Sequence, residues 1–376
     1  MGWLRRRADA AVALVLGTTT AVVLAGGLDR SFDFDESVSV ASTISRGSAL
    51  VPLTETTTFN THPLFAVGQS VWWAVGGEGE ARQRILPVVY GAAAVAVLAG
   101  WATRRLGVRS GVAAGAVLAL NPMFVTQARL VRGYSLATLG VVVATATLID
   151  HVRREQDRPG SGPGWGLLVH AVALVVSLGT HLYAAVPLGA VGIGALIVLR
   201  RIDWRLWSAW VVAGIGVATV YLPTFAELRD TAEARGTGFK PWFARLTTWE
   251  VLGRDRATAV VIGAVALVGV AALVTRSVSQ RAGVGTAAVV VPAMVLAQGW
   301  ILWQVLQPAD LYPRFFLVVV PLVALAVGVG VRRVPWLTAA GAVGLLFAVD
   351  HVGDIRDREV PIRDAAAAVH AAEALG

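Results

Sequence analysis

The chain has 376 residues, of which 56% are hydrophobic and only 15% are charged, and its mean hydropathy is +0.67. This composition excludes an ordinary water-soluble domain and indicates a polytopic membrane protein. The absence of cysteine excludes disulfides, thiolate metal sites and thiol catalysis. The net charge of +8 lies mostly in short loops between apolar segments, so it argues for a membrane orientation signal and against a nucleic-acid partner.

About eleven apolar segments are predicted to be membrane-spanning helices, which indicates an all-α bundle. The first follows an arginine-rich N-terminus and has no small-residue cleavage site after it. We therefore expect it to be retained rather than removed as a signal peptide. The predicted spans cover about residues 8–28, 85–101, 111–125, 134–149, 166–178, 183–199, 206–225, 258–274, 284–302, 315–331 and 334–349.

The charged loops predict the orientation of these spans. About half of the 32 basic residues lie in six short loops, whereas the loops on the other side are longer and hold most of the acids. Basic loops face the cytoplasm, so we expect a cytoplasmic-membrane protein with a cytoplasmic N-terminus and an extracytoplasmic tail over 350–376. Residues 62–75 must then lie on the membrane, because a crossing there would place most arginine clusters outside. The transmembrane module is 1–349, with outer loops over 29–84 and 226–257, and we expect no sizeable soluble domain after it.

Three carboxylates, Asp33, Asp35 and Glu36, lie within four residues just after the first span. Rings and acids alternate over residues 32–35, which predicts an extended strand with both rings on one side. We expect Asp35 to cap a short helix over residues 36–46. Backbone N–H groups at a helix start favour the ionised carboxylate, which suits a general base or a ligand for a divalent cation. The alternative is an interfacial loop whose acids are solvated.

The rest of the first outer loop continues to the second span. His62 and Pro63 open a segment that contains Trp72 and Trp73, and we expect this segment to form a helix in the outer membrane interface. The second large outer loop, 226–257, mixes charges with tryptophans, so it either covers a site or is a solvated loop.

Several arginines are predicted on outer turns, against the charge bias of the other short loops. Because a guanidinium can clamp a phosphate with two hydrogen bonds, we expect an anionic ligand beside them. His181 and Tyr183 lie in a tight outer hairpin, where His181 is either a hydrogen-bonded interfacial residue or a catalytic group. The arginines are Arg84, Arg129, Arg132 and Arg314.

The chain has no GxxxxGK[ST] segment, no strand-flanked GxGxxG, no HExxH and no GxSxG. ATP-driven chemistry, zinc-peptidase chemistry and a serine nucleophile therefore lack support. Acids and arginines on one side of a membrane indicate group transfer instead. The acid would deprotonate an acceptor hydroxyl while the arginines stabilise a departing phosphate.

In order along the chain, these landmarks resemble the GT-C superfamily of membrane glycosyltransferases, especially the protein O-mannosyltransferase and aminoarabinose transferase branch. His62-Pro63-Leu64 is similar to that family's His-Pro-Pro-Leu segment without the second proline. The usual Arg-x-Tyr segment is stretched here, so either Arg129 or Arg132 inherits its arginine. The other matching segments are Asp35-Glu36, Arg84-Ile85-Leu86-Pro87, Asn121-Pro122, Gln127-Ala128-Arg129, Arg132-Gly133-Tyr134 and Arg314-Phe315-Phe316 with Pro321.

The resemblance implies a polyprenyl-phosphate sugar donor and transfer, with inversion, to an acceptor hydroxyl on the extracytoplasmic side. It implies that Asp35 is the base, with Asp33 as the rival, and that Glu36 orients the acceptor. The family sometimes uses a divalent cation such as Mg²⁺ or Mn²⁺, for which Asp33, Asp35 and Glu36 are the candidate ligands. The implied donor-phosphate site comprises either Arg129 or Arg132, together with Arg314, Arg84, His181 and Tyr183. The implied acceptor loop contains His62 and Tyr134.

The resemblance leaves the acceptor open among a glycan, a lipid and a protein. A different class of function, a lipid-linked-sugar flippase without covalent chemistry, would need polar side chains along a path through the bilayer. The predicted spans contain few, chiefly His170, Ser177 and Gln298, which could be ordinary helix-to-helix hydrogen bonds. A non-catalytic scaffold is the third alternative.

Overall fold

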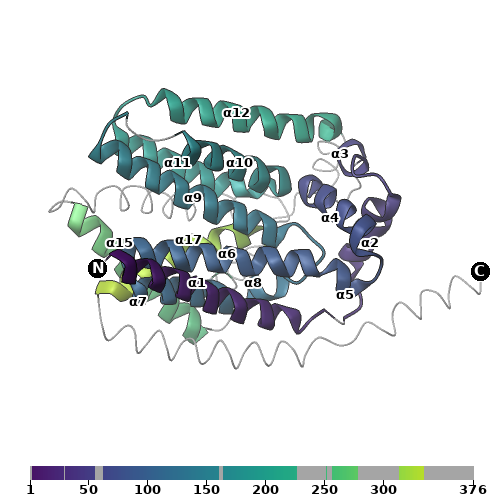
Figure 1. Cartoon of the computed structure of the whole chain (residues 1–376), viewed down its shortest axis with the longest axis horizontal. Helices are drawn as coiled ribbons and strands as arrows, with labels where there is room; N and C mark the ends of the chain where they lie inside the picture. Colours follow the sequence, from purple (N-terminus) through teal and green to yellow (C-terminus); the bar gives the residue numbers. More distant parts are fainter. Residues whose placement is uncertain are drawn as a thin grey trace, which may run out of the picture.

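The structure is a computed structural model that describes residues 2–28, 30–55, 62–160, 164–226, 251, 256–277 and 313–333. Within these residues every regular element is a helix, which confirms the prediction of an all-α membrane protein (Figure 1). The predicted spans 284–302 and 334–349, most of the loop 226–257 and the tail 350–376 lie outside the described residues.

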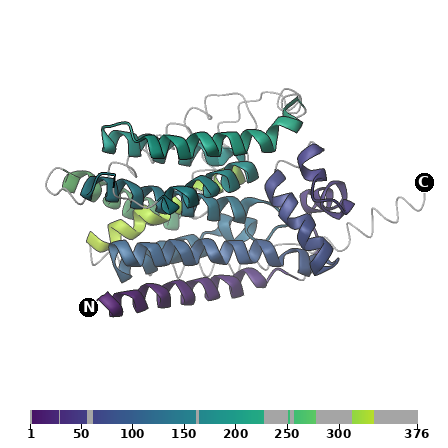
Figure 2. The same cartoon turned by 45° about the horizontal axis from the view of Figure 1, so that its top comes forward.

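Long helices form one bundle, and several short ones gather at one of its ends (Figures 1 and 2). Six segments of the described residues are long and apolar enough to cross a membrane: Arg7–Ala25, Glu80–Leu106, Tyr134–Asp157, Leu182–Leu199, Trp204–Thr224 and Arg314–Arg332. The long helices are α1 (Gly2–Ala25), α6 (Ile85–Leu106), α7 (Val108–Leu120), α9 (Tyr134–Asp157), α10 (Trp165–Thr180), α11 (Ala185–Leu199), α12 (Trp204–Tyr221), α15 (Arg256–Ser277) and α17 (Val320–Arg333).

Small residues let the long helices approach closely. A Cβ added to Gly140 of α9 would lie 2.7 Å from the Cβ of Ser177 in α10, so the two backbones could not keep this distance with a larger residue. Ser177 Oγ donates across the same contact to the Ala137 carbonyl at 3.0 Å. His170 Nδ1 contacts the Ala144 carbonyl at 3.0 Å, and Trp210 Nε1 donates to His170 Nε2 at 3.1 Å. His170 and Ser177 therefore both make helix-to-helix hydrogen bonds.

The short helices come from the first predicted outer loop and lie at one end of the bundle, where α5 contacts α6 and α4 contacts α10 (Figure 2). The segment after His62 is helical as predicted. The elements are α2 (Phe34–Ser42), the 3-10 helix η1 (Ile44–Arg46), α3 (Val51–Thr54), α4 (Pro63–Gly76) and α5 (Glu80–Gln83).

The predicted local structure of the acidic stretch is wrong in two respects. Asp33, not Asp35, caps α2: its Oδ1 accepts from the Glu36 N–H at 2.7 Å, while Glu36 Oε2 accepts from the Asp33 N–H at 2.9 Å. This reciprocal capping box satisfies two N–H groups at once, which a cap at Asp35 would not do. Phe34 is therefore helical rather than extended. Its ring is exposed, whereas Phe32 packs against a buried cluster, so the two rings do not share one side.

Candidate active site

The residues that the sequence predicted on the outer side meet at one end of the bundle, where hydrogen bonds and packing join α2, α4, α6, α9 and α10. The 3-10 helices η2 (Leu182–Ala184) and η4 (Pro313–Val319) complete this end. The contributing segments are distant in the sequence and adjacent in space, as expected for a site assembled by the fold.

Glu36 and Arg84 form a buried ion pair beneath this end. The Glu36 side chain is 0% exposed, and its Oε2 accepts from Arg84 NH2 at 2.7 Å. Its Oε1 accepts from the Val131 N–H at 2.7 Å and from Arg84 Nε at 3.2 Å. Arg84 also donates to the carbonyl groups of Arg30 and Ser31. The pair thus ties α2, the start of α6 and the turn before α9 together.

Burial raises the pKa of Glu36 above its usual value, although the hydrogen bonds and charge of Arg84 oppose this shift. Both of its oxygens accept hydrogen bonds from this chain. A carboxylate used in this way positions the backbone around it.

Asp35, one residue earlier, has a different environment. Its side chain is 19% exposed, and Oδ2 lies 2.8 Å from Arg314 NH1 and 3.7 Å from Arg132 NH1. Arg132 NH1 also donates to the Asp35 carbonyl at 3.3 Å. Because Asp35 lies in the first turn of α2, its carboxylate points away from the capping box and toward these two guanidinium groups. The cluster offers a reachable carboxylate and two cations side by side.

The structure separates the two arginines that the sequence left open. Arg132 contacts Asp35. Arg129 is buried, donates from Nε to the Val125 carbonyl at 2.9 Å, and packs against Gly27, where an added Cβ would lie 2.8 Å from Arg129 Cδ. Gly27 therefore provides the room that the Arg129 side chain occupies.

An aromatic cluster lies next to the arginines. The His62 ring is 5.0 Å from Tyr134 and 5.2 Å from His181, measured between ring centroids. Tyr183 stacks on Phe315 with centroids 4.8 Å apart and planes 13° from parallel. Phe315 follows Arg314 directly, so the stack helps to fix the position of that guanidinium.

The two histidines are held in their neutral form. Burial, and then the charge of Arg132, lowers the pKa of His62 well below its usual value, and the same causes lower the pKa of His181 to about 3. His62 Nδ1 lies 2.9 Å from the Thr180 carbonyl and must therefore carry the proton. Its Nε2 is then an acceptor. Among the described residues, His62 Nε2 and His181 Nε2 have no hydrogen-bond partner although both are buried.

The three acids of the first outer loop face different partners. Asp33 Oδ1 caps α2, the Glu36 oxygens face Arg84 and Val131, and the Asp35 carboxylate faces Arg314. Only one group of three ligand-type side chains lies together among the described residues, and it contains none of these acids. The capping box and the ion pairs turn the three carboxylates in different directions, and the cation site expected at Asp33, Asp35 and Glu36 stays a prediction.

The sequence singled out most residues that meet here, but it missed several partners. The Val131 N–H and the Thr180 carbonyl are backbone groups, for which side-chain identity carries no signal. The stacking role of Phe315 was equally hidden, since it depends on a contact with Tyr183 from another helix.

No known protein family and no curated protein matches the sequence, but solved structures match it. The chain superimposes on ArnT from Cupriavidus metallidurans in the apo state with a TM-score of 0.59 and 16% identity, over 91% of this chain and 62% of that one. It matches the same protein bound to undecaprenyl phosphate with a TM-score of 0.60 and 16% identity, over 92% and 63%. It also matches the apo oligosaccharyltransferase of Archaeoglobus fulgidus with a TM-score of 0.50 and 11% identity, over 93% of this chain and 56% of that one.

The chain has a GT-C fold. This confirms the fold that the sequence resemblance implied. The chain spans less than two thirds of the length of each of these proteins. Identities this low show the GT-C fold alone, so the roles of individual residues are argued below from their geometry.

Proposed function

We propose that the chain is a membrane glycosyltransferase that moves a sugar from a polyprenyl-phosphate donor to an acceptor hydroxyl. The observation that carries the proposal is the Asp35 carboxylate, partly exposed and held between Arg132 and Arg314 at one end of a GT-C fold. A base and two phosphate-binding groups in contact are what such a transfer requires. The solved neighbour with undecaprenyl phosphate supports this class of donor.

In the proposed reaction Asp35 accepts the proton of the acceptor hydroxyl. The hydroxyl oxygen forms a bond to the anomeric carbon from the side opposite the phosphate. The bond between that carbon and the phosphate oxygen breaks, and its electron pair leaves with the polyprenyl phosphate. Arg132 and Arg314 stabilise the negative charge that develops on the phosphate. The products are the inverted glycoside, the lipid phosphate and protonated Asp35.

The donor phosphate would share the arginines with Asp35. A guanidinium has five N–H groups, so Arg314 can bind a phosphate oxygen while retaining one contact to the carboxylate. The shared contacts would hold base and leaving group at a set distance. Glu36 and Arg84 would position α2, because their hydrogen bonds fix the backbone just before Asp35 and tie it to the Val131 backbone.

The neutral histidines would bind hydroxyl groups. His62 Nε2 and His181 Nε2 are buried acceptors near Arg132, and a sugar or acceptor hydroxyl would supply the missing donor. Tyr134 and Tyr183 would pack against the sugar ring or the lipid. The proposed acceptor is a glycan, a lipid or a protein, and the proposed orientation in the cytoplasmic membrane has this site outside.

The test is transfer by purified protein in nanodiscs, with a panel of undecaprenyl-phosphate sugars and membrane extract as the acceptor source. We expect Asp35→Asn to abolish the lipid-phosphate product, while Asp33→Asn retains it because asparagine still caps a helix. Full activity of Asp35→Asn would overturn the assignment of the base.

A flippase is the alternative function. In the described spans His170 and Ser177 form hydrogen bonds to neighbouring helices. These two side chains are therefore used in helix packing and do not line a path for a polar substrate. Movement of donor across liposomes without any covalent product would favour the flippase and contradict the transferase.

A further inference from the structure

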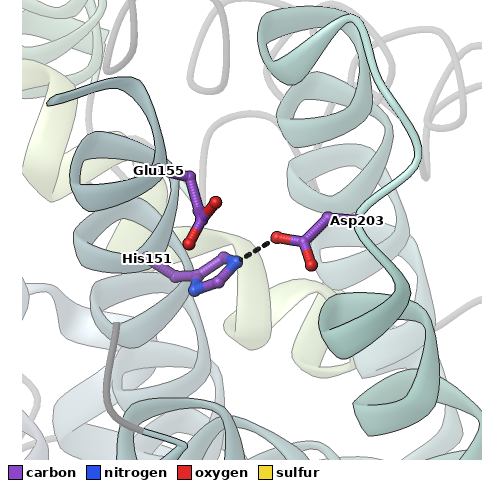
Figure 3. Close-up of side chains that lie close together, drawn as sticks. All are labelled: His151, Glu155 and Asp203. Atoms are coloured by element: carbon purple, nitrogen blue, oxygen red, sulfur yellow. Dashed lines mark hydrogen bonds and ion pairs between the residues drawn. The ribbon is translucent and has the colours of Figure 1, made fainter. Parts of the chain in front are cut away.

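A second cluster of ionisable side chains lies at the end of the bundle opposite the candidate active site. His151 and Glu155 occupy the last turns of α9, and Asp203 caps the start of α12 (Figure 3). Tyr134 of the candidate active site begins the same helix. At 1.5 Å per residue, His151 is about 25 Å from Tyr134 along α9.

The three side chains point toward one another. His151 and Glu155 are four residues apart, so they lie on the same face of α9, and Asp203 faces them from the connection between α11 and α12 (Figure 3). His151 Nε2 is 2.7 Å from Asp203 Oδ2, and one ligand atom from each residue lies within 4.8 Å of the other two. All three side chains are more than nine-tenths buried.

Each carboxylate uses one oxygen to fix the backbone and turns the other to the cluster. Asp203 Oδ1 accepts from the N–H groups of Arg205 and Leu206 at 3.1 and 3.4 Å, which leaves Oδ2 for His151. Glu155 Oε2 accepts from the Gly160 N–H at 3.0 Å and from Arg201. Glu155 Oε1 is buried and, within the part of the chain that the structure describes, has no hydrogen-bond partner.

Glu155 Oε1 is therefore suited to bind a cation. A buried carboxylate oxygen without a donor is costly, and the described residues supply no N–H for it. A metal ion would satisfy Glu155 Oε1, Asp203 Oδ2 and His151 Nε2 together. Arg201 would not prevent this, because its side chain is 43% exposed and contacts only the other oxygen of Glu155 in this cluster.

We propose that His151, Glu155 and Asp203 bind a divalent first-row transition metal, with zinc as the best-matched ion. Imidazole nitrogen with carboxylate oxygen is a zinc-type ligand set, whereas Mg²⁺ and Ca²⁺ prefer oxygen alone. Binding would remove the proton shared by His151 Nε2 and Asp203. The ion would link the end of α9 to the start of α12, far from Asp35, so the role is structural and independent of the proposed transferase activity.

The experiment uses the whole chain in nanodiscs after removal of metal with a chelator. Zn²⁺ is titrated by calorimetry, and Co²⁺ by its visible absorption, which reports the ligand geometry. We expect one ion per chain, with Mg²⁺ unable to compete. Glu155→Gln and Asp203→Asn should each weaken Zn²⁺ binding by more than about tenfold, and the asparagine keeps the helix cap.

Asp150→Asn is the matched control. Asp150 precedes His151 and pairs with Arg105 at 2.8 Å outside the cluster, so this variant removes a neighbouring acid and should leave Zn²⁺ binding unchanged. Zn²⁺ should also raise the unfolding temperature of the wild type and of Asp150→Asn only. Substoichiometric binding would overturn the proposal. So would equal binding by the wild type and the two ligand variants, because the cluster would then be a metal-free network of ion pairs.

Discussion

The two ends of the helix bundle use arginine in opposite ways. At the candidate active site the Arg84 and Arg132 side chains are 3% and 5% exposed and contact acids from α2. At the other end the Arg104 and Arg201 side chains are 54% and 43% exposed, and they pair with Asp150 and Glu155 from the solvent-accessible side. A buried guanidinium needs partners for its donors, whereas an exposed one is solvated. Burial therefore distinguishes Arg84 and Arg132 from Arg104 and Arg201.

Asp35 and Glu36 are adjacent in the sequence but differ in burial in the same way as these arginines. Glu36 is enclosed and saturated with hydrogen bonds, and Asp35 is partly open beside two cations. A carboxylate in the first environment organises the backbone, and one in the second is available to a substrate.

The largest expected effect is on catalysis. Asp35→Asn should lower the rate of transfer by about 10²- to 10⁴-fold, the usual contribution of a general base, while the chain still folds because the asparagine oxygen can accept from the same arginines. Glycosyl transfer measured by lipid-phosphate release checks it, with Asp33→Asn as the control. A loss of equal size in both variants would mean that the loop conformation, not the base, limits the reaction.

Removal of Arg84 should be the largest change in stability. Arg84→Met leaves the Glu36 carboxylate buried without its cation, which should lower the free energy of unfolding by about 3–5 kcal/mol. Thermal unfolding in detergent measures this. Arg104→Met, at the exposed end and 3.9 Å from Asp150, should cost less than about 1 kcal/mol. Similar losses in the two variants would erase the distinction between the two ends.

Donor binding should distinguish the arginines of the two ends. Arg132→Ala and Arg314→Ala should each weaken binding of undecaprenyl phosphate by about 10- to 100-fold, since each removes a charged hydrogen bond of about 1.5–3 kcal/mol. Arg201→Ala should leave this affinity unchanged. Calorimetric titration with the lipid phosphate in nanodiscs provides the measurement. Unchanged affinity in all three variants would place the phosphate elsewhere.

The smallest expected effect is a pH dependence of stability. The pKa of His181 falls from 6.5 in the unfolded chain to about 3 in the fold, because of burial and then the charge of Arg132. Below pH 6.5 the unfolded chain binds a proton that the folded one does not, so stability falls as the pH is lowered toward 3. The loss is about 1 kcal/mol per pH unit. Unfolding midpoints between pH 7 and 5 should show a shallower slope for His181→Asn than for the wild type, and identical slopes would contradict the buried neutral state.

Much of the bundle was predictable because a membrane span is a local property of about 20 apolar residues. Helices cover the described parts of the predicted spans, and the segment after His62 is helical. The cap of α2 was misassigned although its signal was present, since Asp33 and Glu36 stand three residues apart in the spacing of a capping box. Both Asp33 and Asp35 have a high propensity to cap a helix. Asp33 takes the cap because it can exchange hydrogen bonds with Glu36, three residues later.

The sequence alone determined a polytopic helical membrane protein and the identity of most side chains that meet at one end of it, because hydropathy and charge bias act over short stretches. Tertiary structure decided that Arg132 contacts Asp35 while Arg129 packs against Gly27, just after α1, and that Arg84 neutralises Glu36. It also decided that His151 and Glu155 meet Asp203. These pairings depend on how helices far apart in the sequence pack, and the side chains themselves are compatible with several partners.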